Sequence, residues 1–443
     1  MARPNVTVIV DDQSFVVPPT ELGSITRGGM VSYNGLITHL GNTAERKRGI
    51  MEIESVNDLI EKLNSPDPVG AGISCDRLNE TYLGHWSTYE RLGLAKPYTA
   101  GGTAARWPGG PTGNWRNEFF AAHNYLQYGG VLVVAGTGSD FNTTVTSTST
   151  PLHNKEVDID VVFAALGGNT GITGHAGGLG DFDIQVATVS NIANTRQDVV
   201  GVVPDNSLGG FSGDAGTISG DAIVPTGVSP TEFTICGYGM KRHLDVTRGS
   251  DLNSNSLVNT SVCSDIAGCI ARNDRLGYPW TSPAGFVRGQ ILDVYDLVKN
   301  PTDAEQDTLY DRKINPVVTF PGEGTVLFGD KTGKDATSTM SRINVSRLFI
   351  YLKKTIGQAA RSLLFKQNDE ITRAQFVNAV TPILNRVKAT RGISDFRVVC
   401  DETNNLPGLV DANQFIADVF IKPTTSINYI HLTFTNKNSD AVL

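Results

Sequence analysis

The stretch Asn117–Tyr128 (NEFFAAHNYLQY), followed by Gly129-Gly130 and then by Val131–Val134 (VLVV), decides the fold class. The first run has the apolar spacing of a helix, and paired glycines commonly end one. The four apolar residues that follow are typical of a strand that is covered on both faces. A helix that leads directly into a fully buried strand indicates an α/β arrangement.

The same alternation continues in both directions along the chain. Upstream, Val56–Leu63 has helical spacing, with Ser55 as its N-cap. Downstream we expect a strand over 157–166, a helix over 182–194 and a second buried strand over 198–203. Alternating strands and helices predict a sheet sandwiched by helices.

A different pattern begins after Trp280. Helices are predicted over 289–298 and 345–364, and another over 371–388, which Pro382 would kink or divide. Three strands are expected to close the chain, over 396–400, 415–421 and 427–434. At the other end, Asn5–Val10 is rich in β-branched residues, and Pro18-Pro19 follows it. We interpret this start as an extended arm with a linker.

Composition and charge exclude several classes of protein. The 443 residues carry a net charge of −8, which argues against nucleic acid as a main ligand. The dense basic run Arg46–Arg48 is flanked by acids and is interpreted as a solvated turn. Five scattered cysteines predict buried free thiols in a reducing compartment. No signal peptide and no apolar run near the ~20 residues of a membrane span is found, so we expect the protein to remain in a cytosol until it is released.

Catalytic and nucleotide-binding motifs are missing. The glycine-rich run 167–174 has no GxGxxG frame, and 329–332 and 333–335 resemble only fragments of a phosphate loop. The seven histidines form no HExxH pair, and His123 is expected to be a core or interface residue. Cys400 falls in a predicted strand, which is a poor place for a nucleophile. The sequence therefore predicts a protein that is not an enzyme and has no catalytic, metal or cofactor site.

A series of short motifs occurs in the last part of the chain. They are Asp265–Gly268 (DIAG), Trp280–Ile291 (WTSPAGFVRGQI), Leu309-Tyr310, Ile314–Val317 (INPV), Val326–Thr332 (VLFGDKT), Arg342–Phe349 (RINVSRLF), Val398–Asn405 (VVCDETNN), Ile421–Pro423 (IKP) and Ser426–Ile430 (SINYI). In these motifs and their order the chain resembles the tail sheath proteins of contractile-tailed bacteriophages of the T4 type. Upstream the likeness is weaker, for example over 119–129 and 194–204. The aspartate, threonine and asparagines of 401–405 are expected to lock a turn after a core strand.

The resemblance implies a layered subunit without the extra exterior domains of larger relatives. We expect an N-terminal arm and linker over 1–24, and an outer α/β domain with a helix-covered mixed sheet over 25–284. A smaller, tube-facing α+β domain is expected over 285–424, followed by a C-terminal strand arm over 425–443. The strand arms would pair with neighbouring subunits by β-augmentation. Their candidate residues are Val6, Val8, Val10, Ile427, Tyr429, Ile430, Leu432 and Phe434. Pairing of both strands within their own subunit is the alternative.

A basic helix is the candidate for contact with the tail tube. Arg373, Arg386, Lys388 and Arg391 lie in or just after 371–388 of a chain that is otherwise acidic. Exposed ion pairs of ~0–1 kcal/mol each would suit contacts that are made and broken together. A solvated helix face remains an equal alternative.

The resemblance also implies partners and a mechanism. The chain would form stacked hexameric rings with itself by strand exchange, around a tail tube protein, between baseplate and tail terminator proteins. It would be assembled in the host bacterial cytoplasm and reside in the virion, with no nucleic acid ligand and no membrane insertion. Contraction of a metastable sheath would drive the tube through the host envelope. A pyocin-like or secretion-type contractile device is the alternative.

Overall fold

The structure is a computed structural model of the whole chain. The residues it describes are 25–32, 50–63, 115–136, 151–153, 155, 157–165, 181–205, 229–244, 257–334, 338–406, 408–409 and 412–426. The predicted arms, 1–24 and 425–443, therefore lie outside the described residues, apart from Thr425 and Ser426. The predicted strand 427–434 and the glycine-rich run 167–174 lie outside them as well.

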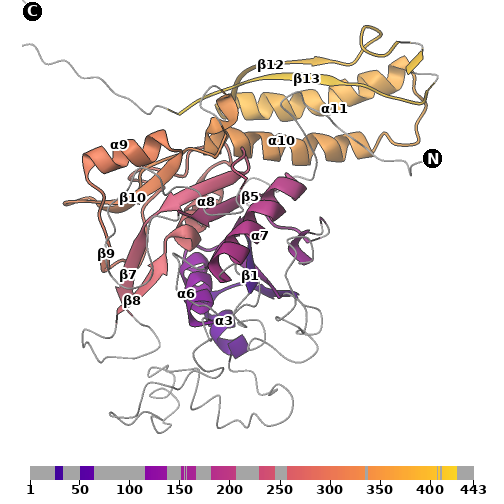
Figure 1. Cartoon of the computed structure of the whole chain (residues 1–443). Coiled ribbons are helices and arrows are strands. Elements are labelled where there is room, and N and C mark those ends of the chain that lie inside the picture. The colour runs from indigo at the N-terminus through magenta and orange to yellow at the C-terminus, as the bar shows by residue number, and fades with distance from the viewer. Residues whose placement is uncertain are drawn as a thin grey trace, which may run out of the picture.

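An eight-stranded sheet forms the centre of the larger part of the molecule (Figure 1). Its order is β11-β10-β6-β5-β4-β1-β3-β2, parallel throughout except for an antiparallel strand at each edge. The strands are β1 (Arg27–Ser32), β2 (Ile50–Ile53), β3 (Val131–Gly136), β4 (Val161–Phe163), β5 (Val200–Pro204), β6 (Thr234–Tyr238), β10 (Ile314–Phe320) and β11 (Gly324–Leu327). The predicted mixed, helix-covered sheet and the α/β class are confirmed.

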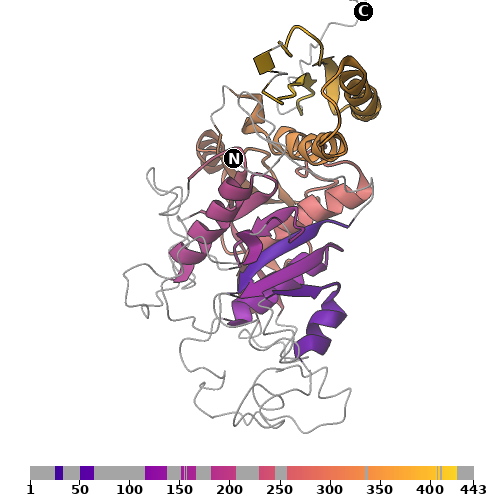
Figure 2. The same ribbon diagram turned by 90° about the vertical axis from the view of Figure 1, so that its right-hand side faces the viewer.

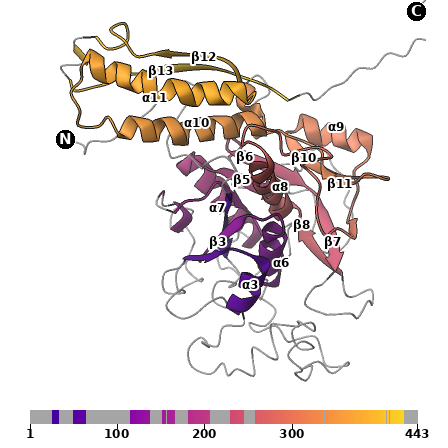
Figure 3. The same ribbon diagram turned by 180° about the vertical axis from the view of Figure 1, so that it is seen from behind.

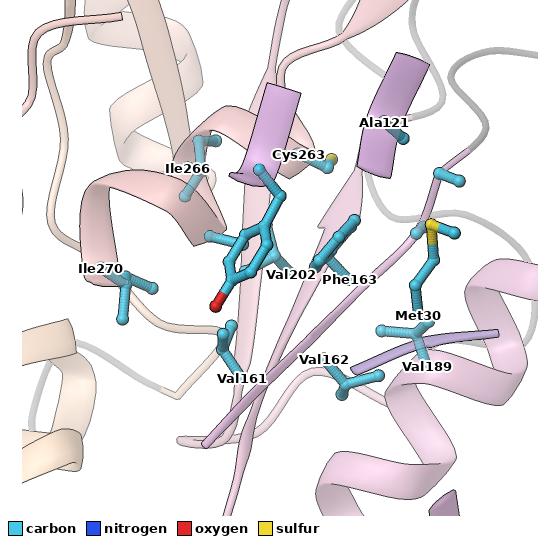
Figure 4. Packing of buried hydrophobic residues seen from close by; sticks show 14 of the residues in the cluster. Met30, Ala121, Val161, Val162, Phe163, Val189, Val202, Cys263, Ile266 and Ile270 are labelled. Atoms are coloured by element: carbon cyan, nitrogen blue, oxygen red, sulfur yellow. The ribbon is translucent and has the colours of Figure 1, made fainter. Parts of the chain in front are cut away.

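Helices cover both faces of this sheet. Helix α6 (Trp115–Leu126) and helix α8 (Cys263–Leu276) lie side by side on one face (Figure 3), and α7 (Asp181–Arg196) packs against β4 and β5 on the other. Because both faces are covered, β4, β5 and β6 are buried along their whole length. Figure 4 shows Val161, Phe163 and Val202 of the strands packed against Ile266 and Ile270 of α8.

Close approach of α6 to the sheet depends on glycine. A Cβ atom on Gly28 would lie 2.5 Å from the Tyr125 ring, and one on Gly130 would lie 2.4 Å from the Tyr125 hydroxyl. The Tyr125 hydroxyl donates to the Thr26 carbonyl at 3.1 Å, and its ring stacks on Phe163 at 5.2 Å. The run that decides the fold in the sequence is therefore seated on strands from two other parts of the chain.

Smaller elements surround the main sheet. They are α3 (Val56–Leu63), the 3-10 turns Pro151–His153 and Thr339–Ser341, the three-stranded sheet β8-β7-β9 with β7 (Met240–Leu244), β8 (Leu257–Ser261) and β9 (Asp296–Leu297), and helix α9 (Asp303–Asp311). Helix α9 begins with a capping box, in which the side chains of Thr302 and Glu305, three residues apart, bond to each other's backbone N–H groups.

The helix predicted over 289–298 is wrong. Its backbone instead bonds to strands on both sides: Ile291 N–H donates to Thr325 O at 2.9 Å, and Val298 N–H donates to Met240 O at 2.9 Å. Ile291 and Leu297 are buried against these strands, so apolar residues occur in this segment without a helix. The backbone N–H groups of this segment donate to strands of two sheets that lie elsewhere in the sequence, and a local sequence pattern does not indicate such partners.

A second, smaller core follows. It is built from α10 (Ile343–Arg361), α11 (Glu370–Ala389) and the antiparallel pair β12 (Ile393–Val399) and β13 (Asp418–Pro423). Figure 2 shows this unit stacked at one end of the sheet. The predicted helices 345–364 and 371–388 are confirmed, and Pro382 does not divide α11 because it lies on the exposed side, where the freed Asn378 carbonyl also lies.

The division between the two cores differs from the predicted boundary at 284/285. Strands β10 and β11 belong to the eight-stranded sheet, since β10 pairs with β6 in parallel through Ile314 and Cys236. The second hydrophobic cluster takes Trp280 from the preceding loop and otherwise begins within α10, at Leu348. Residues 285–334 therefore pack with the larger unit.

Candidate functional site

The sequence motifs converge on one groove with a volume of about 720 Å³. Its walls come from the loop 280–288, from α9, from Phe328–Asp330 after β11, from Asn344 at the start of α10 and from Arg391 after α11. Thr424, Thr425 and Ser426 run along it, so the described chain ends inside this groove. Six of the motif segments, far apart in the sequence, thus meet where the predicted C-terminal arm begins.

Trp280 fixes the loop against the C-terminal unit. Its ring is 4% exposed, stacks on Tyr278 at 5.0 Å and meets the edge of Tyr351 at 5.1 Å. The indole N–H donates to the Thr390 carbonyl at 3.3 Å, and the Asn344 amide donates to the Trp280 carbonyl at 3.4 Å. The loop therefore holds both helices of the smaller unit at once.

Asp330 clamps the root of the C-terminal segment. One carboxylate oxygen accepts from the Arg342 guanidinium at 2.7 Å, and the other accepts from the Ser426 hydroxyl at 2.5 Å. Arg342 also donates to the Tyr310 hydroxyl at 2.5 Å. Asp330 is 3% exposed, so these are charge-assisted bonds in a largely dry setting. The clamp ties the segment after β13 to the larger unit.

The fragments that resemble a phosphate loop have structural roles. The Lys331 ammonium donates to the Tyr310 carbonyl at 2.6 Å and lies 3.6 Å from the centre of that ring, while its backbone N–H donates to Asn315. Burial, together with Arg342, lowers the pKa of Lys331. Lys334 pairs with Glu232 at 3.3 Å. Both ammonium groups are thus committed to protein acceptors.

A buried polar seam joins α10 to the larger unit. Arg347 forms a two-fold ion pair with Asp274 at 2.5 and 2.6 Å, and the Thr26 hydroxyl donates to the same carboxylate at 2.7 Å. About two turns further along α10, Lys354 pairs with Asp160 at 2.7 Å. Burial opposes ionisation of Asp160, but Lys354 outweighs it and lowers the pKa of that carboxyl. Stability from this pair is present above the ordinary pKa of aspartate and is lost as the pH falls through the lowered value.

The two-stranded sheet has the predicted turn chemistry. After β12, Asp401 accepts from the Thr403 N–H at 2.8 Å, and the Asn404 amide donates to Val399 O and to Asp418, each at 2.9 Å. Asn405 exchanges two bonds of 2.8 Å with the backbone of Ile416. Among the described residues, β12 and β13 pair only with each other, so each strand has an outer edge without a described partner.

The four basic candidates do not lie together. Arg373 is 9% exposed and packs inside the smaller unit, where one of its terminal nitrogens has no hydrogen-bond partner. Arg386 and Lys388 are exposed on α11, and Lys388 pairs with Asp395 at 2.7 Å. Arg391, with a positive φ of 62°, turns into the groove. Arg386 and Lys388 are therefore the two candidates that are exposed on this helix, and Lys388 already has an acidic partner.

Other reactive groups are buried structural ones. The four cysteines among the described residues are free and buried, and burial raises the pKa of Cys269 to about 12 and of Cys400 to about 11. His123 lies 6% exposed in α6, as expected of a core residue. In the part of the chain that the structure describes, no cluster of three or more His, Cys, Asp or Glu side chains could hold a metal. No helix within those residues has the length and apolar character to span a membrane.

Comparison with known proteins supports the resemblance. Residues 335–437 match the family described as phage tail sheath C-terminal domain. A tail sheath protein of Vibrio phage KVP40 is 40% identical over 276 residues, which is 58% of this chain and 40% of that protein. The tail sheath protein of Enterobacteria phage T4 is 46% identical over 173 residues, 39% of this chain and 26% of that protein. The alignments thus span under half the length of these relatives.

The fold also has a solved counterpart. The contracted helical sheath of the anti-feeding prophage aligns over 99% of this chain and 100% of that one, with a TM-score of 0.60 and 16% identity. At that identity the likeness concerns the fold alone. The resemblance to tail sheath proteins that the motifs predict is confirmed, and the family match over 335–437 spans the smaller unit.

Proposed function

We propose that this chain is the structural subunit of a phage contractile tail sheath, which polymerises around a tail tube and contracts to drive it through the host envelope. The observation that carries the proposal is the match of 335–437 to the tail sheath C-terminal domain, in a unit bound to the rest of the subunit by the seam of α10. No catalytic step is included: energy would be stored in subunit packing during assembly and released by a switch between two packings.

Electron microscopy of the purified protein tests this function. We expect it to assemble into hollow tubes or stacked helical rings as its concentration rises, because sheath subunits contain both halves of their own interface. Sedimentation at several concentrations gives the critical concentration for assembly. A protein that remains a small, monodisperse particle at every concentration and salt would contradict the proposal.

A pyocin-like or secretion-type contractile device is the second candidate. It is favoured by the fold, which aligns over nearly the whole chain with the sheath of the anti-feeding prophage. Identities of 40% and 46% to phage proteins favour the phage sheath. Protein analysis of purified particles separates the two: a phage sheath occurs in particles that carry a head and DNA, and a device sheath in particles without either.

The remaining partners follow from the same proposal. The chain would bind copies of itself in stacked hexameric rings, a tail tube protein inside, and baseplate and terminator proteins at the two ends. It would be assembled in the host cytoplasm and remain in the virion tail. The smaller unit would face the tube, and the larger one would lie outside.

Strand exchange is the proposed link between subunits. The N-terminal arm, with Val6, Val8 and Val10, and the C-terminal arm, with Ile427 to Phe434, would each add a strand to a neighbour. Support comes from the β12–β13 sheet, which has no third strand among the described residues and is smaller than sheets that are stable alone. The groove supports a defined exit for the C-terminal arm, since Asp330 holds Ser426 there.

We expect the exposed basic residues of α11, Arg386 and Lys388, to contact the tube. Replacing Arg386 and Lys388 together by Glu is expected to weaken sheathing of tubes, because even ~0.5 kcal/mol per subunit is repeated sixfold in every ring. It should not prevent the protein alone from forming tubes, which need no tube protein. The measurement is the fraction of sheathed particles when variant and tubes are mixed at low and moderate salt.

The matched control for this variant keeps the charges: Arg386→Lys with Lys388→Arg should sheathe tubes as well as the unchanged protein. Normal sheathing by the charge-reversed protein would assign these two residues to a solvated face. Because Arg373 is buried, we do not expect it to contact the tube directly.

A further inference from the structure

Phe365 stands out because it contributes little to its own subunit. It occupies the turn between α10 and α11, with a positive φ of 67°, a region that bulky residues rarely adopt. Its side chain is 87% exposed. Ile371, at the start of α11, is 67% exposed at the same turn. We name these two residues the tip patch.

Glycine would suit this position better than phenylalanine in an isolated subunit. It adopts positive φ without a steric penalty, and here it would remove an apolar ring that faces water. A strained backbone that presents an exposed aromatic ring to solvent gains nothing from the described residues of this chain. This points to a contact with another molecule as the benefit of the ring.

A second exposed apolar surface lies beside the groove. Phe286, Phe320 and Phe328 form a cluster with ring centres 5.1–6.3 Å apart. Phe286 and Phe328 remain 46% and 42% exposed, and Val287 next to them is 85% exposed. We name these four residues the aromatic lip. Phe328 also lines the groove in which the described chain ends.

The two surfaces lie at opposite ends of the molecule. Helix α10 begins next to α9, where Arg342 contacts Tyr310, and its 19 residues carry the chain about 28 Å away before the tip. Figure 1 shows α9 at one end and the paired helices α10 and α11 projecting to the other. Two different patches at opposite ends are the requirement for a head-to-tail contact that repeats into a ring or helix.

The path of the last described residues points to a second copy of this chain as the molecule that covers the lip. The described chain stops at Ser426, in the groove beside the lip, and 17 further residues continue from there. If these residues reach a neighbouring copy, as proposed above, that copy lies within their reach, which is about 56 Å when 17 residues are fully extended. The lip is therefore an exposed apolar surface beside the point from which the arm leaves toward that copy.

We propose that the tip patch of one subunit docks on the aromatic lip of the next copy, so that Phe365 packs against Phe286, Phe328 and Val287 of its neighbour. The inference rests on the proposed function, because it names the body-to-body contact that accompanies arm exchange. It gives a strained, exposed phenylalanine at the tip a partner to pack against. It also explains why the lip is left open at the end where the arm departs.

Substitution of Phe365 by Gly tests the tip. The variant should unfold at the same temperature as the unchanged protein or at a higher one, because the strain is relieved. Its critical concentration for assembly should nevertheless rise roughly tenfold to a hundredfold, since a buried aromatic contact is lost at each interface. Stability and assembly thus move in different directions, which a purely structural role for Phe365 would not produce.

Val287→Glu tests the lip without disturbing the fold, because Val287 is almost fully exposed. It should raise the critical concentration at least as much as the tip variant. Tyr295→Glu is the control, a 70% exposed residue outside both patches, and should leave assembly unchanged. In the double variant the two effects should be clearly less than additive, since both remove one contact.

Assembly of Phe365→Gly at the unchanged concentration would overturn the inference, and so would full additivity in the double variant. Failure of the unchanged protein to assemble at all is a different result: it would contradict the sheath function itself and leave no interface to assign.

Discussion

Removal of residues 1–12 is expected to abolish polymerisation while leaving a folded subunit. The same result is expected when the residues after Thr425 are removed. Each truncation takes away a strand that we propose to complete the β12–β13 sheet of a neighbour. Without that strand the neighbouring subunit has nothing of its own to pair with its sheet, so the link between the two subunits is lost. The measurement is sedimentation for assembly, with circular dichroism and thermal unfolding for the folded state.

Point substitutions distinguish strand pairing from mere length. Val8→Pro removes a backbone donor and should abolish assembly like the truncation, whereas Val8→Thr keeps the donor and the β-branched shape and should assemble. Ile430→Pro and Ile430→Val form the same comparison at the other end. Tubes of normal length from a truncated chain would show that the arm at that end does not link subunits.

Replacing Arg347 by Met is expected to lower the free energy of unfolding by about 3–5 kcal/mol. The guanidinium is 6% exposed and holds both oxygens of Asp274, which is itself 9% exposed. Without it, that carboxylate would retain the Thr26 hydroxyl and little else to offset its burial. Urea unfolding of the full chain below its assembly concentration measures the change.

The same helix offers a matched control. Arg361→Met removes a guanidinium at the exposed end of α10 and should change stability by no more than about 0.5 kcal/mol. The double variant of Arg347→Met with Asp274→Asn should recover part of the loss, since no charge is then left buried without a partner. Equal effects of Arg347→Met and Arg361→Met would show that the seam does not stabilise the subunit.

Buried regular elements were predictable because their sequence pattern is local. In the run Val131–Val134 and in the helix 182–194, the residue types and their spacing already indicate the element and its burial. Contacts between distant segments were not predictable in the same way. Lys353 and Lys354 are adjacent in a helix and would be taken for solvated residues, yet both are buried. Their acceptors, Gln197 and Asp160, are far away in the sequence.

The groove was predictable only in part. Many of its residues lie in the motifs that resemble sheath proteins, but no spacing relates Trp280 to Ser426. The error over 289–298 has the same cause, since its backbone completes two sheets. Among the tube-facing candidates, the burial of Arg373 could have been foreseen: it lies three residues before Phe376 and so shares its side of the helix.

The antiparallel pairing of β12 and β13 has a mechanical consequence. Six register pairs link the strands, from Ile393–Pro423 to Val399–Asp418. If a neighbour pulls on the residues beyond Ser426 along the axis of β13, the tension places these pairs in shear, so that they resist together. A pull across the strands would open them one at a time. The hydrogen bond from Ser426 to Asp330 lies between the pulled residues and β13. A transverse force therefore acts on this bond before it acts on the strand pairs.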